Sequence, residues 1–356
     1  MGALDSESLK HSLSSLKQLE TLSIQMNGRF PGLWEAMNGL NIKSLNLCLR
    51  PRLSPSLSDL SPLRVSDEIL KLEPAQLLCQ SLLSLRQLES LSISVDEYHP
   101  GSLWEALKGQ NIKSLSLSLS YQCFSWRGLC AKSLHQSLLS LSQLEKLSID
   151  VNTNIPGLWE ALIDLNIKSL SLSLSCVRKG LHEESLSQSL SSLKRLEMLT
   201  LHVYTYIDIH LPQSLKFFYY YCDALIPSKL RDLVEKLAAC THTIEFKLNF
   251  VCAAGVYPTE HVPLQEYSLI QQELRARKNI AVKRFRMYER ICKSNTYEGF
   301  YNAESSTYER DAGGVTDDDH DDHSVNDDAY ESFSKWMTDR NVNRISIRLQ
   351  ICPDSI

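Results

Sequence analysis

Three stretches of this chain carry nearly the same sequence. Residues 16–49, 85–119 and 141–174 each contain a QLExLSI segment that is followed by NIKSL. A fourth copy begins at Leu193 with LKRLEMLTLHV and then loses the tryptophan segment of the other three. Repeated units of this kind bury their apolar faces by stacking on one another. We therefore expect a solenoid, and a binding surface rather than a catalytic pocket.

Each copy contains two apolar alternations with a period of two residues, which is typical of a strand with one buried face. In the first copy these are Leu22, Ile24, Met26 and Leu45, Leu47, Leu49. Equivalent leucines within a copy lie 23 or 24 residues apart. Longer steps lead to the next copy: 46 residues from the first to the second, which we interpret as one long repeat plus an insertion, and then 32 and 29 residues. The steps without the insertion are close to the usual leucine-rich repeat of roughly 20–29 residues. The unit is therefore two repeats, one short and one long.

The segments between the strands have helical patterns. Leu134, Leu138, Leu141 and Leu144 recur at three- and four-residue intervals, as the buried stripe of a helix requires. The segment that begins at Pro156 is predicted to be a short helix opened by proline. Alternating strands and helices predict an α/β leucine-rich-repeat solenoid, with a curved parallel sheet inside and helices outside.

The chain resembles leucine-rich-repeat proteins, nearest to the alternating short and long repeats of ribonuclease inhibitor and of NACHT-containing NOD-like receptors. The segments SLSSLKQLETLSI and NIKSLSLSLS are similar to C-terminal repeats of large invertebrate receptors of that kind. The resemblance covers roughly residues 8–250 well. One departure concerns the Asn or Cys that usually follows the strand, for which this chain has Met26, Leu49, Val95, Leu119 and Val151. We expect packing to hold these turns instead.

The resemblance implies a non-enzymatic protein-interaction module. We expect the ligand-sensing or autoinhibitory leucine-rich-repeat region of a NOD-like innate immune receptor. The alternative is a stand-alone adaptor or enzyme inhibitor that holds a protein partner on its concave face.

The composition excludes several other classes. The net charge is −5, from 37 basic and 42 acidic residues, which gives no basic footprint for nucleic acid. Ten cysteines are scattered with no CxxC pair, so we expect a reducing, cytoplasmic location rather than a disulfide framework. No run of about 18 apolar residues is present, and the opening residues lack the apolar core of a signal peptide, so we expect no membrane span.

We divide the chain into four parts. They are a leucine-rich-repeat solenoid over 1–250 with an insertion loop at 50–80, a degenerate repeat or C-terminal extension over 251–301, an acidic disordered loop over 302–330, and a helix–strand cap over 331–356. Beyond the repeats we expect helices over 228–239 and 264–278 and strands over 244–248 and 282–288. Residues 345–351 alternate as a strand that we expect to close the open end of the solenoid.

No catalytic, cofactor or metal constellation stands out. The pairs Trp34-Glu35, Trp104-Glu105 and Trp159-Glu160 recur once per copy, so we interpret them as structural and the tryptophans as core. Phosphate-loop, GxSxG and HExxH motifs are missing. In the acidic loop, Asp317 to Asp328 approach an EF-hand spacing, but Asp322 occupies the place where the turn needs glycine. We therefore predict no metal site.

The outward positions of the strands are the remaining candidates for binding a protein partner. Hydroxyls on stiff strands make a shallow hydrogen-bonding surface, although we interpret most of these serines as soluble filler. Aromatic residues dominate interface energies, so we expect the stronger contacts in the fourth copy. The candidate contact residues are Ser92, Ser116, Lys146, Ser148, Asp150, Ser171, His202, Tyr204, Lys216 and Phe218.

Overall fold

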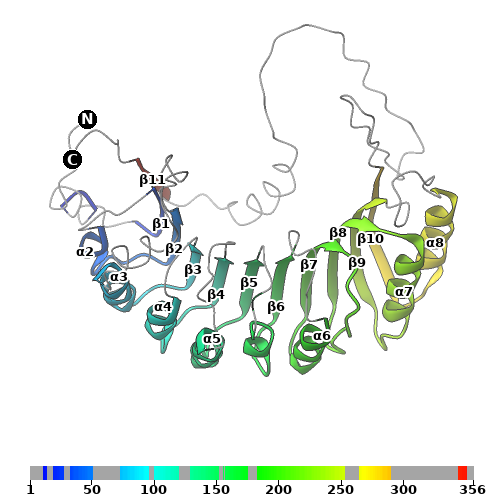
Figure 1. The fold of residues 1–356 in the computed structure, drawn as a ribbon, viewed down its shortest axis with the longest axis horizontal. Coiled ribbons are helices and arrows are strands. Elements are labelled where there is room, and N and C mark those ends of the chain that lie inside the picture. Colours follow the sequence, from blue (N-terminus) through cyan, green and yellow to red (C-terminus); the bar gives the residue numbers. More distant parts are fainter. Residues whose placement is uncertain are drawn as a thin grey trace, which may run out of the picture.

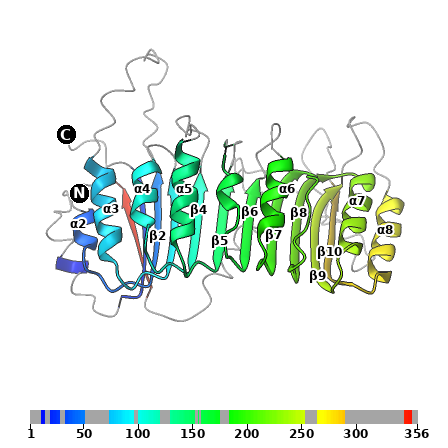
Figure 2. The same cartoon turned by 90° about the horizontal axis from the view of Figure 1, so that it is seen from below.

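The computed structural model of the chain is a curved α/β solenoid (Figure 1). It describes residues 11–13, 19–27, 33–50, 73–95, 100–119, 129–151, 155, 157–174, 183–252, 264–289 and 344–350. The strands line the inner side of the arc and the helices cover the outer side, where they stand in a row in front of the sheet in Figure 2. The predicted leucine-rich-repeat solenoid is thus confirmed.

The strands of the described part form one sheet. They are β1 (Thr21–Asn27), β2 (Ser44–Arg50), β3 (Ser90–Val95), β4 (Ser114–Leu119), β5 (Lys146–Val151), β6 (Ser169–Leu174), β7 (Met198–Thr205), β8 (Phe217–Leu225), β9 (Ile244–Cys252), β10 (Ile280–Glu289) and β11 (Arg344–Gln350). Their order in the sheet is β10-β9-β8-β7-β6-β5-β4-β3-β2-β1-β11, and every pairing is parallel.

The helices lie on the convex side of the sheet. They are α2 (Leu33–Met37), α3 (Glu73–Ser84), α4 (Pro100–Leu107), α5 (Leu129–Ser140), the 3-10 turn η1 (Glu160–Leu162), α6 (Glu183–Ser192), α7 (Pro227–Ala238) and α8 (Leu264–Ala276). The third tryptophan segment therefore keeps only a 3-10 turn where the second forms the longer helix α4.

The core is a single apolar layer between the sheet and the helices. Strand register stacks leucine on leucine from repeat to repeat, as in Leu91 beside Leu115 and Leu147. Trp104 and Trp159 are fully buried in this layer, as predicted for core residues. Because parallel strands are covered by helices on this face, only the concave face of the sheet is left for contacts.

A buried serine ties each tryptophan segment to the next helix. The Ser81, Ser137 and Ser189 hydroxyls donate to the backbone carbonyls of Trp34, Trp104 and Trp159 at 2.5–2.6 Å. Each serine lies on the helix that follows its tryptophan, so the bond joins successive repeats. Because each buried hydroxyl needs a partner and finds it in the preceding repeat, these bonds help to fix the spacing of the repeats.

Charged residues at the starts of the strands alternate in sign along the sheet. The QLE and NIK segments, with RLE and SLK in the fourth copy, supply these residues in successive repeats. They are Glu20, Lys43, Glu89, Lys113, Glu145, Lys168, Glu197 and Lys216, and from Lys43 onward each backbone N–H donates to the carbonyl of the preceding residue of the row. Four ion pairs join neighbours at 2.6–3.1 Å. The carboxylate of Glu20 raises the pKa of Lys43, and Lys168 lowers the pKa of Glu145. We call this row the charge ladder.

Several predicted boundaries shift. Residues 73–80 of the predicted insertion loop belong to helix α3, and Pro74 is tolerated there because it lies in the first turn. Of the two predictions for residues 251–301, the described part fits the degenerate repeat, because α8 and β10 continue the same sheet to Glu289. Helix α7 matches its predicted range within one residue at each end, whereas strand β9 begins at the predicted Ile244 and extends four residues further, to Cys252.

The predicted strand at residues 345–351 is present as β11, but it lies at the other end of the sheet. It pairs with β1, with Ile345 beside Leu22 and Ile347 beside Ile24 (Figure 1). Residues 302–330 and the predicted helix before β11 lie outside the described residues.

Candidate functional site

The concave face is built from rows of side chains that run across the strands. One row contains Ser92, Ser116, Ser148, Ser171, Thr200, Tyr219, Lys247 and Arg284, from β3 to β10. In parallel strands that pair in register, alternate residues of every strand point to the same side. The rows therefore bring residues that are far apart in the sequence onto one continuous surface.

The part of this surface on β3 to β6 carries mainly small hydroxyls, and we call it the hydroxyl half. It brings together the predicted contacts Ser92, Ser116, Lys146, Ser148, Asp150 and Ser171. The Ser118 hydroxyl donates to the Asp150 carboxylate at 3.2 Å. Serine side chains present little apolar area, so this half offers hydrogen bonds without an anchoring contact.

The part on β7 to β10 carries large side chains, and we call it the aromatic–basic half. Phe217, Tyr219 and Tyr221 project from alternate positions of β8 and are partly exposed. The Lys247 ammonium lies over the Tyr219 ring, 4.4 Å from its centroid. The Tyr221 ring meets His202 edge-on at 6.0 Å between centroids. Such rings supply large contact area with little side-chain freedom to lose.

His202 and Tyr204 mark the border of this half on β7. Both are partly exposed, as predicted for contact residues. The His202 Nε2 atom lies 3.6 Å from the Asp223 carboxylate, at the end of β8. The contact with Asp223 directs the imidazole toward β8, so the rings of His202 and Tyr221 form one continuous surface.

The basic side chains of this half lie on the last two strands. Arg284 and Arg286 occupy successive outward positions of β10, beside Lys247 and Asn249 of β9. A register shift between Val282 and Arg284 leaves Lys283 as an extra residue, whose Nζ atom is 4.0 Å from the Glu245 carboxylate. A bulge of this kind places two residues of one strand opposite one residue of its neighbour, and the extra residue here is Lys283.

Two polar atoms at the centre of this basic group lack a hydrogen-bond partner. Arg286 Nε and Asn249 Oδ1 are shielded from solvent, and neither has a partner among the described residues. Their residues are neighbours in the register of β9 and β10. Buried polar atoms in this state are uncommon in folded proteins.

Two predicted contact residues are not on the concave face. Phe218 is fully buried and packs against Phe246 and Tyr220. The prediction was one residue out of phase, and a shift of one residue moves every side chain of a strand to the opposite face. Lys216 precedes β8 and belongs to the charge ladder, where it pairs with Glu197 at 3.1 Å.

The sequence carried signals for what that prediction missed. Lys216 aligns with the lysine of NIKSL in the earlier copies, and this alignment would have placed Phe217, Tyr219 and Tyr221 outward. The pattern over 282–288 predicts a strand, but its position two strands from the aromatic strand depends on the stacking of two further repeats.

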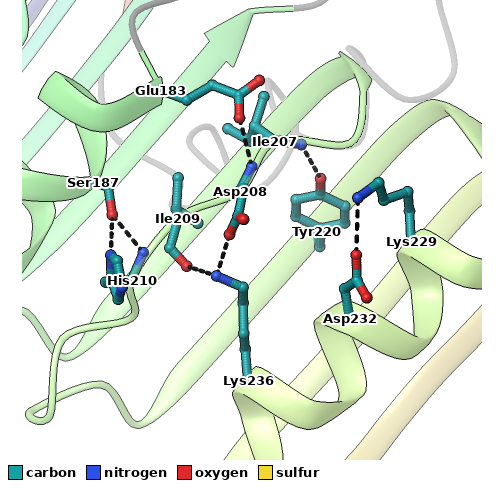
Figure 3. A network of polar contacts seen from close by, with 10 residues as sticks. All are labelled: Glu183, Ser187, Ile207, Asp208, Ile209, His210, Tyr220, Lys229, Asp232 and Lys236. Atoms are coloured by element: carbon teal, nitrogen blue, oxygen red, sulfur yellow. Dashed lines mark hydrogen bonds and ion pairs between the residues drawn. The ribbon is translucent and has the colours of Figure 1, made fainter.

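On the convex side, a polar network replaces the lost tryptophan helix of the fourth copy (Figure 3). We call residues 206–210 the strap. The Asp208 N–H donates to Glu183 at 3.1 Å, and the His210 N–H donates to the Ser187 hydroxyl at 2.7 Å. Tyr220, whose pKa is raised by burial, accepts from the Ile207 N–H at 3.4 Å. The strap is thus held through its backbone.

Helix α7 holds the strap from the other side. The Lys236 ammonium pairs with Asp208 and donates to the Ile209 carbonyl at 2.9 Å (Figure 3). The hydrogen bond from Lys236 lowers the pKa of Asp208. Burial and nearby carboxylates raise the pKa of Tyr206, whose ring lies under the Lys229 ammonium at 5.4 Å.

The Ser187–His210 contact within this network is structural. The hydroxyl is 2.6 Å from His210 Nδ1, but it also accepts the backbone N–H of the same histidine and is 5% exposed. A nucleophile needs access to a substrate, and this oxygen is enclosed by the strap that it holds.

The described residues present little other chemistry. They contain no group of three His, Cys, Asp or Glu side chains able to hold a metal ion, and the Asp317–Asp328 run lies outside them. Burial raises the pKa of the Cys222 thiol to about 12, so it stays protonated at neutral pH. Within the same residues, no helix has the length and apolar character to cross a membrane.

Comparison of the chain with models of protein families and with curated proteins finds no match to either.

Proposed function

We propose that the chain is a protein-binding module whose principal contact surface is the aromatic–basic half of the concave face. The single observation that carries this proposal is the cluster of Phe217, Tyr219 and Tyr221 on β8. These rings remain partly exposed on a rigid sheet, although the other face of the same strand is fully buried. Aromatic and arginine side chains are the residue types that most often dominate binding energy at protein interfaces.

The architecture supports a binding role because it keeps the contact surface rigid. Every strand of this half is paired on both sides except β10, and a buried aromatic layer backs the sheet. Phe250 packs against Phe285 and Tyr267 within that layer, with ring centroids 5.3–5.4 Å apart. A surface that is ordered before binding loses less conformational entropy when a partner docks.

The sequence resemblance to NOD-like receptors extends the proposal to a biological setting. In that setting the module senses a ligand, or holds its receptor inactive, in the cytoplasm of an immune cell. The stand-alone adaptor or inhibitor is the alternative, and both versions use the same concave face without catalysis. The distinction between them lies in what is joined to the module, whereas the contact surface is common to both.

A crosslinking experiment tests the location of the contact surface. A photo-reactive phenylalanine derivative replaces Thr200, at the border of the aromatic–basic half, and in a control replaces Leu139, which is exposed on the convex helix α5. The full chain is then irradiated in an extract of its source cells, and the captured protein is identified and purified. We expect capture from Thr200 and not from Leu139.

Binding of the purified partner then decides the proposal. Tyr219→Ala/Tyr221→Ala removes two aromatic anchors. We expect the Kd to rise roughly 30-fold, which corresponds to a loss of about 2 kcal/mol for the two substitutions together. Ser92→Ala/Ser116→Ala is the matched control on the hydroxyl half, and we expect less than a twofold change. Capture from Leu139 alone, or a Kd that neither double variant changes, would overturn the proposal.

A further inference from the structure

The aromatic–basic half has two chemically different sides, and its partner must match both. The apolar side is β8, with Phe217, Tyr219 and Tyr221. The cationic side is β9 and β10, with Lys247, Lys283, Arg284 and Arg286, and Glu245 is the carboxylate among them. Parallel strands are about 4.8 Å apart, so the two sides follow one another within about 10 Å.

We propose that this surface binds an acidic segment of a partner protein, in which apolar residues are followed by carboxylates. The inference rests on the proposed function and names the chemistry of the partner. A segment that crosses the strands places its apolar residues on β8 and its carboxylates over β9 and β10. Three extended residues cover the distance from one side to the other.

The arrangement of the cations favours several carboxylates over one. Lys247 and Arg284 are register neighbours, and Arg286 lies two residues further along β10. The Cα atoms of outward residues two apart on one strand are separated by about 7 Å, so the three cations extend over a length of the face that can accept more than one carboxylate. Arginine binds carboxylates through paired N–H donors, and both Arg284 and Arg286 are partly exposed on this face.

The same observations disfavour single-stranded nucleic acid, which also binds to aromatic and basic residues. The aromatic and cationic side chains are segregated on separate strands instead of alternating along one track. Carboxylates of Asp150, Asp223 and Glu245 lie along the same face or at its border, and the chain as a whole carries a net charge of −5. A phosphate backbone that runs along the face beyond this narrow basic group would be repelled by these carboxylates.

The chain's own acidic run matches only one of the two sides. Residues 317–328 supply seven aspartates and one large aliphatic residue, Val325, and the nearest aromatic residue, Tyr330, lies just beyond the run. Within the run, the aspartates offer charge to the cations, but Val325 alone is too small to cover the three rings of β8. A partner segment that carries both kinds of residue satisfies the whole surface, so we assign the site to a partner.

The test uses the full chain and a fluorescein-labelled peptide of about six residues, long enough to cross three strands. The peptide has three apolar residues (leucine, tyrosine, leucine) followed by three glutamates, and its reversed sequence is used in parallel. Fluorescence anisotropy gives the Kd. We expect one of the two peptides to bind. Its affinity should decrease when NaCl is raised from about 0.01 M to about 0.15 M, because screening weakens the charged contacts.

Charge-neutralised variants locate the contact. Arg284→Gln/Arg286→Gln is expected to raise the Kd at least about tenfold, since it removes two charge-assisted contacts. Lys132→Gln/Arg275→Gln is the matched control, because it removes the same charge from exposed convex helices. Circular dichroism checks that each variant is folded. Lys247→Gln provides a single substitution if the double variant fails to fold, and we expect about a threefold increase from it.

Four outcomes would overturn the inference. One is that neither acidic peptide binds. Another is that peptides with glutamine in place of the three glutamates bind equally well. Either result would leave the proposed protein-binding function intact. A third is tighter binding of a single-stranded oligonucleotide of similar length. The fourth is a tenfold gain in peptide affinity when all seven aspartates of 317–328 are changed to asparagine, which would assign the surface to the chain's own acidic run. If Tyr219→Ala/Tyr221→Ala does not change the Kd of the purified partner, the proposed function itself is wrong.

Discussion

The hydroxyl half and the aromatic–basic half show how one repeating sheet supports two different surfaces. Both halves have the same parallel register and the same buried alternate positions. On β4, Ser114, Ser116 and Ser118 point into the concavity, whereas β8 has Phe217, Tyr219 and Tyr221 at equivalent positions. The inward residues are thus fixed by packing, while the outward residues are available for binding.

The two halves also differ in their convex support. The hydroxyl half is backed by buried tryptophans that are joined by serine hydroxyls to the next helix. At the start of the aromatic–basic half, the strap is held by charged and polar side chains instead. Helix α6 takes part in both kinds of support, because Ser189 bonds to the Trp159 carbonyl and Ser187 bonds to the strap at His210. The two halves can therefore be compared directly at this helix.

The largest expected effect comes from removing a buried tryptophan. Trp159→Ala leaves a cavity between η1 and the sheet, and we expect a loss of roughly 3–5 kcal/mol in the free energy of unfolding. Urea denaturation followed by circular dichroism measures it. Hydrogen exchange should show the loss first in β5 and β6, because solenoid repeats contact mainly their neighbours. An equal loss of protection from hydrogen exchange in β9 and β10 would mean that the two halves unfold as one unit.

A smaller effect is expected from the two serines of α6. Ser187→Ala leaves the His210 N–H without its hydrogen bond, and we expect it to lower the free energy of unfolding by about 1–3 kcal/mol, the cost of an unsatisfied buried group. Ser189→Ala removes one of two hydrogen bonds to the Trp159 carbonyl, which still accepts the Leu162 N–H at 2.9 Å, so we expect a smaller loss of about 0.5–1.5 kcal/mol. Ser191→Ala, on the exposed side of α6, is the control. If Ser187→Ala has no effect, the strap does not depend on this bond.

The third prediction concerns a backbone position that differs between the copies. Gly39 and Gly109 have φ angles of 76° and 73°, and the equivalent residue of the third copy is Asp164 with φ 60°. Asp164→Gly should raise the free energy of unfolding by roughly 1 kcal/mol or less, because a side chain is disfavoured in this region. Thermal denaturation measures the shift. Gly109→Asp is the reverse experiment, and a stabilising result there would contradict the explanation.

The smallest effect is an acid sensitivity confined to the strap. Lys236 lowers the pKa of Asp208, so this pair stabilises the folded state above the unfolded aspartate value of 3.8. The stabilisation is lost as the pH falls through the lower folded pKa. Asp208 is largely exposed, so we expect a small change. Lys236→Met should reduce the pH dependence of exchange at Ile207 to Ile209, and an unchanged dependence in that variant would exclude the pair as its cause.

The sequence was sufficient to predict the repeating strands and most of the helices, but not all of the surface. The leucine periodicity predicted the solenoid because inward residues repeat under the same packing constraint, as Leu91 and Leu115 do. The β8 face was predicted wrongly because five successive aromatic residues, 217–221, have no polar alternation that distinguishes the buried from the exposed side. Their register is set by Lys216 at the start of the strand, through its bonds to Glu197.

The basic side of the aromatic–basic half was harder to predict than its aromatic side. Arg284 and Arg286 belong to a repeat that shares no QLE or NIK wording with the others. Their place beside Lys247 depends on the bulge at Lys283, for which the local sequence has no glycine or proline signal. The relation between β1 and β11 was equally inaccessible, because a sequence pattern identifies a strand but not its neighbour.

The pairing of β11 with β1 has a consequence for biosynthesis. During translation, β1 leaves the ribosome long before β11 is made, so one edge of the nascent sheet stays open while the following repeats stack on its other side. An open parallel edge can pair with another nascent chain. Polysomes, where many copies grow side by side, are therefore the setting in which this fold is most exposed to mispairing.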